Sequence, residues 1–285
     1  MILASIPSPS SNGFSLGPLF VHFYGLFYVI GISFSVLITR WLWGARGGDR
    51  ELPLTVALWG VPAGIIGGRL YHDITSWNEV PHNWWGWIAV WEGGLGIWGG
   101  ILGGVLGGLI PLYRRRVNIP SFLDCAAPGI LVAQAVGRLG NYFNQELFGG
   151  PTSLPWALQI DPAHRPAHYL AYSTFHPTFL YELLWDLALA GALAWLGLRR
   201  RIRPPGIFAL YVTGYSAFRI FEETLRVDPA HRFLGERLNF WVTCGLTLAG
   251  ALWFWATQRK RGEPDRWAAD PGEQRPAAAT TAGPP

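Results

Sequence analysis

A cluster of side chains able to bind an anion ends a long apolar stretch. Residues 137–149 read GRLGNYFNQELFG and place an arginine, two asparagines, a glutamine and a glutamate together. Ionisable groups at membrane depth mark functional sites. If the stretch is helical, Arg138, Asn141 and Asn144 are three residues apart and share one face, and two glycines let a neighbouring helix or ligand approach it. The segment predicts a polar pocket in an apolar wall.

Polar residues in three other apolar stretches are predicted to face the same side. Arg219, Glu223 and Arg226 occupy positions i, i+4 and i+7, so that they share a helix face and Glu223 can pair with either arginine. Tyr24 comes early in the first stretch and Arg69 late in the second. Because successive spans alternate in direction, all of these residues are expected in one half of the membrane.

Two arginines in one pocket suit a phosphodiester. A guanidinium group matches phosphate oxygens in bidentate fashion and stays charged in a dry site. Arg138 and Arg219 therefore predict binding of an anionic phospholipid, and Tyr24, Asn141 and Asn144 supply hydroxyl and amide donors around it.

Each residue also has a structural explanation. Arg69 and Arg226 can extend to the membrane interface, and Glu223 can simply neutralise Arg219 so that the helix inserts. His176 stands just before a proline that suits the first turn of a fifth helix.

The composition of the chain indicates which kind of secondary structure positions these groups. The chain has 285 residues, 50% hydrophobic, 14% charged and 16 of them Trp, with a mean hydropathy of +0.22. This is typical of an all-α polytopic membrane protein. Seven spans approach the ~20 residues that cross a bilayer, at 19–39, 54–71, 88–113, 121–141, 178–198, 206–225 and 238–257.

Basic residues cluster on alternate connections, around Arg46, Arg115, Arg201 and Arg261. The positive-inside rule places these clusters in the cytoplasm, so that the N-terminus lies outside and the C-terminus inside. No Lys or Arg precedes Arg40, and the first span is expected to be its own targeting signal.

This orientation divides the chain into four parts. Residues 1–18 form an outside N-terminal segment and residues 19–257 the membrane domain. Residues 142–175 form an outer-face loop region between the fourth and fifth helices. Residues 258–285 form a basic, then Pro- and Ala-rich cytoplasmic tail that is expected to be disordered.

Several other classes are disfavoured. The pI of about 9.3 comes from short loops flanking spans, which indicates orientation rather than nucleic-acid binding. Cys125 and Cys244 give neither a disulfide framework nor a metal spacing. His164 and His168 are four apart without a third ligand, so no metal or cofactor is expected. Nine glycines recur through the third span and predict close helix packing.

Residues 137–149 resemble the signature of bacterial prolipoprotein diacylglyceryl transferases, of the form G-R-x-G-N-[FY]-x-N-x-E-x-x-G. The resemblance covers residues of about 20 to 257. It extends through Tyr24-Gly25, Gly67-Gly68-Arg69, Trp91-Glu92-Gly93-Gly94, Asp124, Pro128, Pro151-Thr152, Pro155-Trp156, His176-Pro177-Thr178, Leu180-Tyr181-Glu182, Phe218-Arg219, Glu223 and Arg226.

The resemblance implies transfer of the diacylglyceryl group of phosphatidylglycerol to the lipobox cysteine thiol of a preprolipoprotein, with release of glycerol phosphate. The reaction is expected at the outer face of the bacterial plasma (inner) membrane, with the bilayer as the enzyme's surroundings. The resemblance assigns roles as follows: Arg138 and Arg219 are essential, Asn141, Glu146 and Gly149 belong to the signature, Tyr24 lines the pocket, and Glu223 and Arg226 support it.

One departure concerns the base that deprotonates the thiol. Many family members carry a His in the third span where this chain has Trp98, which is expected among the substrate-binding residues about ten residues into that span. Three alternatives remain open. His176 or Glu146 acts as base, a phosphate oxygen takes the proton, or the arginines lower the thiol pKa.

The main rival function is an outer-leaflet phospholipid scramblase or anion transporter, which needs a polar route to the cytoplasm. The inner halves of the spans are apolar, which favours an enzyme. Other membrane transferases and proteases are disfavoured, because no clustered Asp motif and no Gly-x-Ser-x-Gly nucleophile is found.

Overall fold

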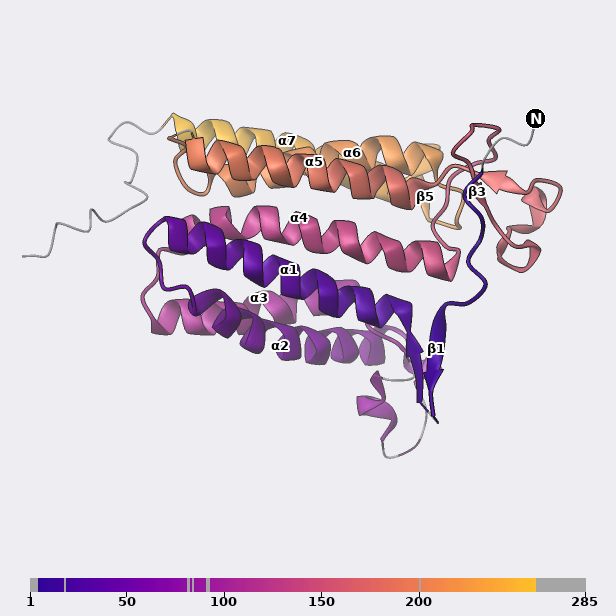
Figure 1. Ribbon diagram of the computed structural model, residues 1–285, viewed down its shortest axis with the longest axis horizontal. Coiled ribbons are helices and arrows are strands. Elements are labelled where there is room, and N and C mark those ends of the chain that lie inside the picture. Colours follow the sequence, from indigo (N-terminus) through magenta and orange to yellow (C-terminus); the bar gives the residue numbers. More distant parts are fainter. Residues whose placement is uncertain are drawn as a thin grey trace, which may run out of the picture.

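The computed structural model describes residues 5–17, 19–80, 83, 85–90, 93–199 and 201–259, so the predicted disordered tail from 260 on and Trp91 and Glu92 lie outside the described residues. Seven long helices lie side by side (Figure 1). They are α1 (Phe23–Ala45), α2 (Leu52–Thr75), α3 (Ile97–Arg114), α4 (Ile119–Asn144), α5 (Thr178–Arg199), α6 (Gly206–Leu225) and α7 (Leu238–Gln258).

All of these helices except α6 are apolar and long enough to cross a membrane. Helix α6 is of similar length but carries Arg219, Glu222 and Glu223 in its C-terminal half. The chain is therefore a multi-pass membrane protein, and the least apolar helix is the one that contributes most to the charge cluster described below.

The helices form three layers (Figure 1). Helices α5, α6 and α7 lie together at one side, α4 and α1 in the middle, and α2 and α3 at the other side. The most extensive contacts join α2 to α3, α1 to α4, α6 to α7 and α4 to α5.

Glycines let α2 and α3 touch through their backbones. A Cβ on Gly67 would lie 2.4 Å from the carbonyl oxygen of Gly99, and one on Gly103 would lie 2.3 Å from that of Ala63. No larger residue fits at these positions. The predicted close packing of the glycine-rich third span is confirmed.

The third span begins later than predicted. Instead of a helix from residue 88, a short 3-10 turn, η2 (Gly86–Ile88), precedes an irregular loop, and α3 starts at Ile97. Gly93 and Gly94 have φ of +93° and +78°, a left-handed conformation that is incompatible with a continuous helix through these positions. Trp98 is thus the second residue of α3 and is 66% exposed, rather than ten residues into a span.

Short hairpins make the chain mostly helical rather than purely α. Residues 19–22, predicted to begin the first span, form an extended strand. The pairs are β1 (Gly13–Leu16) with β2 (Leu19–His22), β3 (Leu158–Gln159) with β4 (Thr174–Phe175), and β5 (Arg232–Phe233) with β6 (Glu236–Arg237). Short turns η1 (Trp77–Glu79), η4 (Pro162–His164) and η5 (Ala167–Tyr169) complete the connections.

The segment between α4 and α5 folds over one end of the bundle, beside the N-terminal residues (Figure 1). It has its own apolar cluster of Phe148, Leu158, Ile160 and Phe175. The buried Gln145 joins it to α4, because its Nε2 donates to Asp161 Oδ2 at 2.7 Å and its Oε1 accepts from the Asp161 amide at 2.8 Å. This Gln145 bond is the largest cause of the lowered pKa of Asp161.

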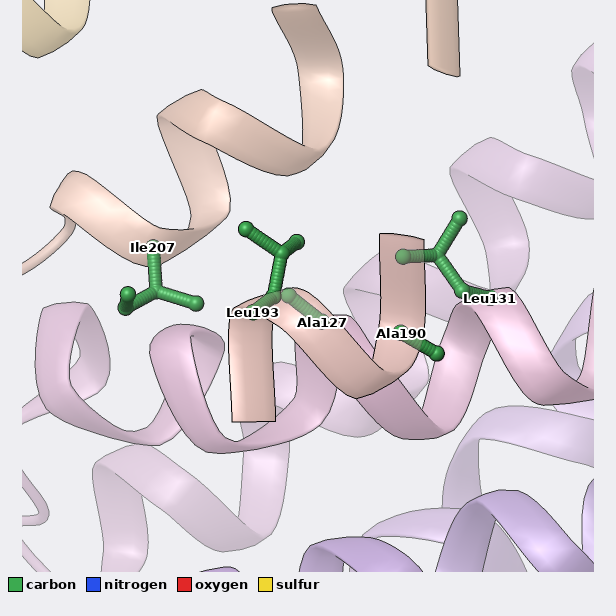
Figure 2. Packing of buried hydrophobic residues seen from close by; sticks show 5 residues of the cluster. All are labelled: Ala127, Leu131, Ala190, Leu193 and Ile207. Carbon is green, nitrogen blue, oxygen red and sulfur yellow. The ribbon is translucent and has the colours of Figure 1, made fainter. Parts of the chain in front are cut away.

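An apolar layer lies within the middle of the bundle (Figure 2). It consists of Ala127 and Leu131 from α4, Ala190 and Leu193 from α5, and Ile207 from α6, all at most 4% exposed. Buried polar residues of these helices lie both before and after the apolar residues in the sequence, such as Asp124 and Asn141 on α4.

Candidate active site

Glu182 of α5 joins the two arginines that were predicted to converge. Arg138 Nη2 donates to Glu182 Oε1, and Arg219 Nη1 donates to Oε2 at 3.2 Å. The Tyr215 hydroxyl also donates to Oε1, at 3.0 Å. The Glu182 side chain is fully buried, while those of Arg138 and Arg219 are 17% and 11% exposed. The expected convergence of Arg138 and Arg219 is confirmed, with a carboxylate between them.

Helix α6 supplies two more carboxylates to Arg219. Glu222 Oε2 accepts from Nη1 at 2.5 Å, and Glu223 Oε1 accepts from Nη2. Their positions three and four residues along the helix allow both contacts. The predicted Arg219–Glu223 pair is therefore confirmed. Buried charges persist only when paired and hydrogen-bonded, and this cluster meets that requirement.

A second tier of charges holds the C-terminal end of α6. Glu223 Oε2 accepts from Arg237 Nε at 2.7 Å, and Arg226 Nη1 lies 3.7 Å from Glu223 Oε1. Asp228 accepts from Arg226 Nε at 2.7 Å and from Arg237 Nη2 at 2.9 Å. Burial alone would raise the pKa of Asp228, but these two arginines outweigh it and lower that pKa.

The end of α4 relays hydrogen bonds from Arg138 to Glu146. Arg138 Nη1 donates to Asn141 Oδ1 at 3.2 Å, and Asn141 Nδ2 donates to Glu146 Oε1 at 2.9 Å. Asn144 Nδ2 reaches the same oxygen at 3.3 Å. The helix ends because Gln145 is left-handed, with φ of 51°. That turn brings Glu146 back to the helix end, where its amide donates to the Asn141 carbonyl at 3.1 Å.

A cavity of about 560 Å³ opens beside this relay, lined by Asn12, His22, Tyr24, Gly25, Val90, Gly93, Asn144 and Glu146. Gly140 is required here, because a Cβ on it would lie 2.1 Å from the Tyr24 ring. Tyr24 and its neighbour Tyr28 share a hydrogen bond of 3.2 Å between their hydroxyls. Tyr24, Asn144 and Glu146, which come from two different helix ends, therefore share one cavity.

Arg69 contacts a loop rather than the charge cluster. Its Nε lies 3.0 Å from Asp73 Oδ1. Its guanidinium also donates to five backbone carbonyls of residues 86–94, including that of Gly93 at 2.7 Å. Because Gly93 lines the cavity, Arg69 shapes one of its walls from behind.

Three further predicted residues lie outside the cavity lining. Gly149 packs tightly, since a Cβ there would lie 2.8 Å from His176 Cβ and 3.2 Å from the Leu225 carbonyl. His176 Nδ1 is 3.1 Å from the Tyr181 hydroxyl, and partial burial lowers the pKa of His176 below its usual value. Trp98 is exposed at the start of α3.

Four residues of this region were missed by sequence reasoning or given only an anchoring role. Glu182 stands four residues after Thr178, near the N-terminal end of α5, where a carboxylate is interpreted as a helix anchor. Glu222 follows Arg219 by three residues, a spacing that by itself predicts an ion pair on one helix face. Arg237 and His22 lie just before helices, where a charged or polar residue is ordinary, so no sequence signal separated them from others.

Known proteins match this chain over nearly its whole length. The model of the family described as prolipoprotein diacylglyceryl transferase matches residues 12–256. The phosphatidylglycerol–prolipoprotein diacylglyceryl transferase of Cutibacterium acnes is 48% identical over 274 residues, covering 95% of this chain and 92% of the relative. Enzyme 2 of the same name from Streptomyces coelicolor is 47% identical, covering 88% and 80%. That of Bifidobacterium adolescentis is 40% identical, covering 91% and 82%.

A multi-pass bundle that buries paired arginines and carboxylates beside a cavity, together with these matches, defines a membrane transferase of lipoprotein biosynthesis. The chain belongs to the prolipoprotein diacylglyceryl transferase family.

Proposed function

We propose that the chain transfers the diacylglyceryl group of phosphatidylglycerol to the lipobox cysteine thiol of preprolipoproteins, at the outer face of the bacterial plasma membrane. The observation that carries this proposal is the meeting of Arg138 and Arg219 at Glu182, connected through Asn141 to a cavity beside Tyr24 and Glu146. Two partly exposed guanidinium groups in a dry site suit a lipid phosphodiester.

The bonds changed in this reaction explain the need for arginines. The thiol sulfur forms a bond to a glycerol carbon, and the bond from that carbon to the phosphate oxygen breaks. Glycerol phosphate leaves with the electron pair, so that negative charge grows on the phosphate. Arg138 and Arg219 stabilise this charge, and they are already oriented by Glu182 and Glu222 before substrate binds.

Glu146, Asn141 and Asn144 would position the substrate rather than carry its charge. The Asn141 and Asn144 amide groups both donate to the Glu146 carboxylate, and Asn141 also accepts from Arg138. Glu223 and Arg226 support Arg219 from the second tier. Gly149 allows the close approach of the segment after α4 to the end of α6, and so holds the signature against the charge cluster.

The apolar layer favours an enzyme over a transporter. Ala127, Leu131, Ala190, Leu193 and Ile207 pack together between α4, α5 and α6 (Figure 2), further along these helices than the charge cluster. An anion carried across would have to pass these side chains without a polar partner, which is costly.

The deciding experiment incubates the purified protein with phosphatidylglycerol labelled in its acyl chains and a lipobox peptide. We expect label on the cysteine of the peptide, and none on a peptide with Ser in place of that Cys. Movement of labelled lipid between vesicle leaflets without peptide labelling would instead establish the transporter.

The outer-face assignment has its own test. A cysteine placed at Ser153, in the segment after α4, is expected to react with a membrane-impermeant reagent on intact cells, whereas one at Arg115 is expected to react only after lysis. The reverse pattern would place the cavity on the cytoplasmic side.

A further inference from the structure

We propose that His22 is the base that accepts the proton of the lipobox thiol, and that Glu146 fixes the opposite wall of the same cavity. The inference rests on the proposed function. A thiol is mostly protonated at neutral pH, so a proton acceptor within reach of the sulfur speeds the attack.

His22 is the imidazole that faces the cavity. It lies at the end of β2, directly before α1, and two residues before Tyr24, and both side chains line the cavity together with Asn144 and Glu146. Its ring stands edge-on to Phe20 with centroids 4.8 Å apart. Within the described part of the chain its ring nitrogens have no hydrogen-bond partner. A ring nitrogen is therefore available to a substrate.

The other candidates are less well placed. The Glu146 Oε1 atom already accepts from the amides of Asn141 and Asn144. His176 faces the Tyr181 hydroxyl and does not line the cavity. Trp98 offers no basic nitrogen and lies exposed at the start of α3.

The cavity also lies beside the position at which the attacking thiol would lose its proton. The relay from Arg138 through Asn141 ends on Glu146, so a phosphodiester held by Arg138 would have its glycerol carbon on the cavity side. The sulfur forms its bond to that carbon, its proton passes to a His22 ring nitrogen, and the carbon–oxygen electron pair leaves with glycerol phosphate. The His22 imidazolium then returns the proton to the departing phosphate.

The test compares two nucleophiles on the full-length protein. Wild type, His22→Gln and the control His164→Gln are assayed with a lipobox peptide containing cysteine and with one containing selenocysteine, whose selenol is already ionised at neutral pH. With the cysteine peptide we expect His22→Gln to lower kcat by about a hundredfold or more, as general-base catalysis contributes about 10²- to 10⁴-fold. His164→Gln, on an exposed turn, is expected to match wild type.

With the selenocysteine peptide, the His22→Gln rate is expected to recover to within about fivefold of wild type, because no proton has to be removed. Equal losses with both peptides would show that His22 only positions substrate, and an unchanged rate with cysteine would show that it has no role. Either result overturns the proposal. Wild type transferring label to the cysteine peptide in the same experiment keeps the proposed function separate from this outcome.

Discussion

Two regions beside the same cavity bury arginines, and they satisfy them in different ways. Arg69 on α2 is held by one carboxylate and five loop carbonyls, while Arg138 and Arg219 are held by glutamates of other helical turns. The Arg69 guanidinium is held by the dipoles of backbone carbonyls, and it in turn holds the loop that carries them. Glutamates hold it with charges on rigid helices and leave part of each arginine exposed. The first arrangement builds a wall, and the second presents cations to a ligand.

The strongest test of this comparison replaces the arginines by lysine. Arg138→Lys and Arg219→Lys keep the charge but lose the bidentate fork. Loss of ~2 to 4 kcal/mol of transition-state stabilisation corresponds to roughly thirty- to a thousandfold in rate. Transfer assays on the folded, purified variants measure it. Rates within twofold of wild type for either variant would remove that arginine from the phosphate site.

Arg69→Ala is expected to act on stability. It leaves Asp73 and the loop carbonyls without their cation, and breaking a buried pair costs about 3–5 kcal/mol. The control Arg40→Ala removes an exposed pair with Glu51 and is expected to cost about 1 kcal/mol or less. Thermal unfolding in detergent compares them. Equal effects of the two variants would show that Arg69 does not hold the loop.

A smaller effect on stability is expected at the close contact between Gly103 of α3 and the Ala63 carbonyl of α2. Gly103→Ala places a methyl group against the Ala63 carbonyl, and such overpacking costs about 1–3 kcal/mol. Gly245→Ala, where a Cβ meets nothing within 4 Å, is the matched control and is expected to leave Tm unchanged or higher, because Ala favours helix. Unfolding curves decide, and a Gly103→Ala variant as stable as its control would show that the contact can relax.

The smallest effect is expected at Trp98. Because Trp98 lies exposed at the start of α3, Trp98→His should change the rate by about twofold or less, as exposed substitutions alter free energies by about 0.5 kcal/mol. The pH profile of kcat/KM for wild type, Trp98→His and His176→Gln measures it. A tenfold gain with a new acidic limb in Trp98→His would mean that a histidine there reaches the thiol.

Local spacing and hydropathy were sufficient to predict part of this arrangement. The helices, the pairing of Arg219 with Glu223 and the meeting of Arg138 with Arg219 all follow from helical periodicity and alternating span direction. Hydropathy did not predict the late start of α3, because the aromatic residues of the preceding loop are as apolar as a span, and only the backbone angles of Gly93 and Gly94 separate the two.

Long-range partners were beyond prediction. Glu182 neutralises two arginines on different helices, and that depends on how α5 sits between α4 and α6. Arg69 was expected in the same half of the membrane as Arg138 and Arg219, but no sequence pattern predicts the contacts of its guanidinium with backbone carbonyls of residues 86–94. His22 lines the cavity because β2 leads directly into α1 beside the end of α4.

The apolar layer of Figure 2 has an electrical consequence. Moving one elementary charge across a membrane potential of 100 mV changes the free energy by about 2.3 kcal/mol. Arg138, Glu182, Arg219 and Glu222 lie toward one end of α4, α5 and α6, and Ala127, Leu131, Ala190, Leu193 and Ile207 lie further along these helices toward the other end. A reaction confined to the end that carries the charge cluster would move no charge through the bilayer and would not dissipate the stored voltage.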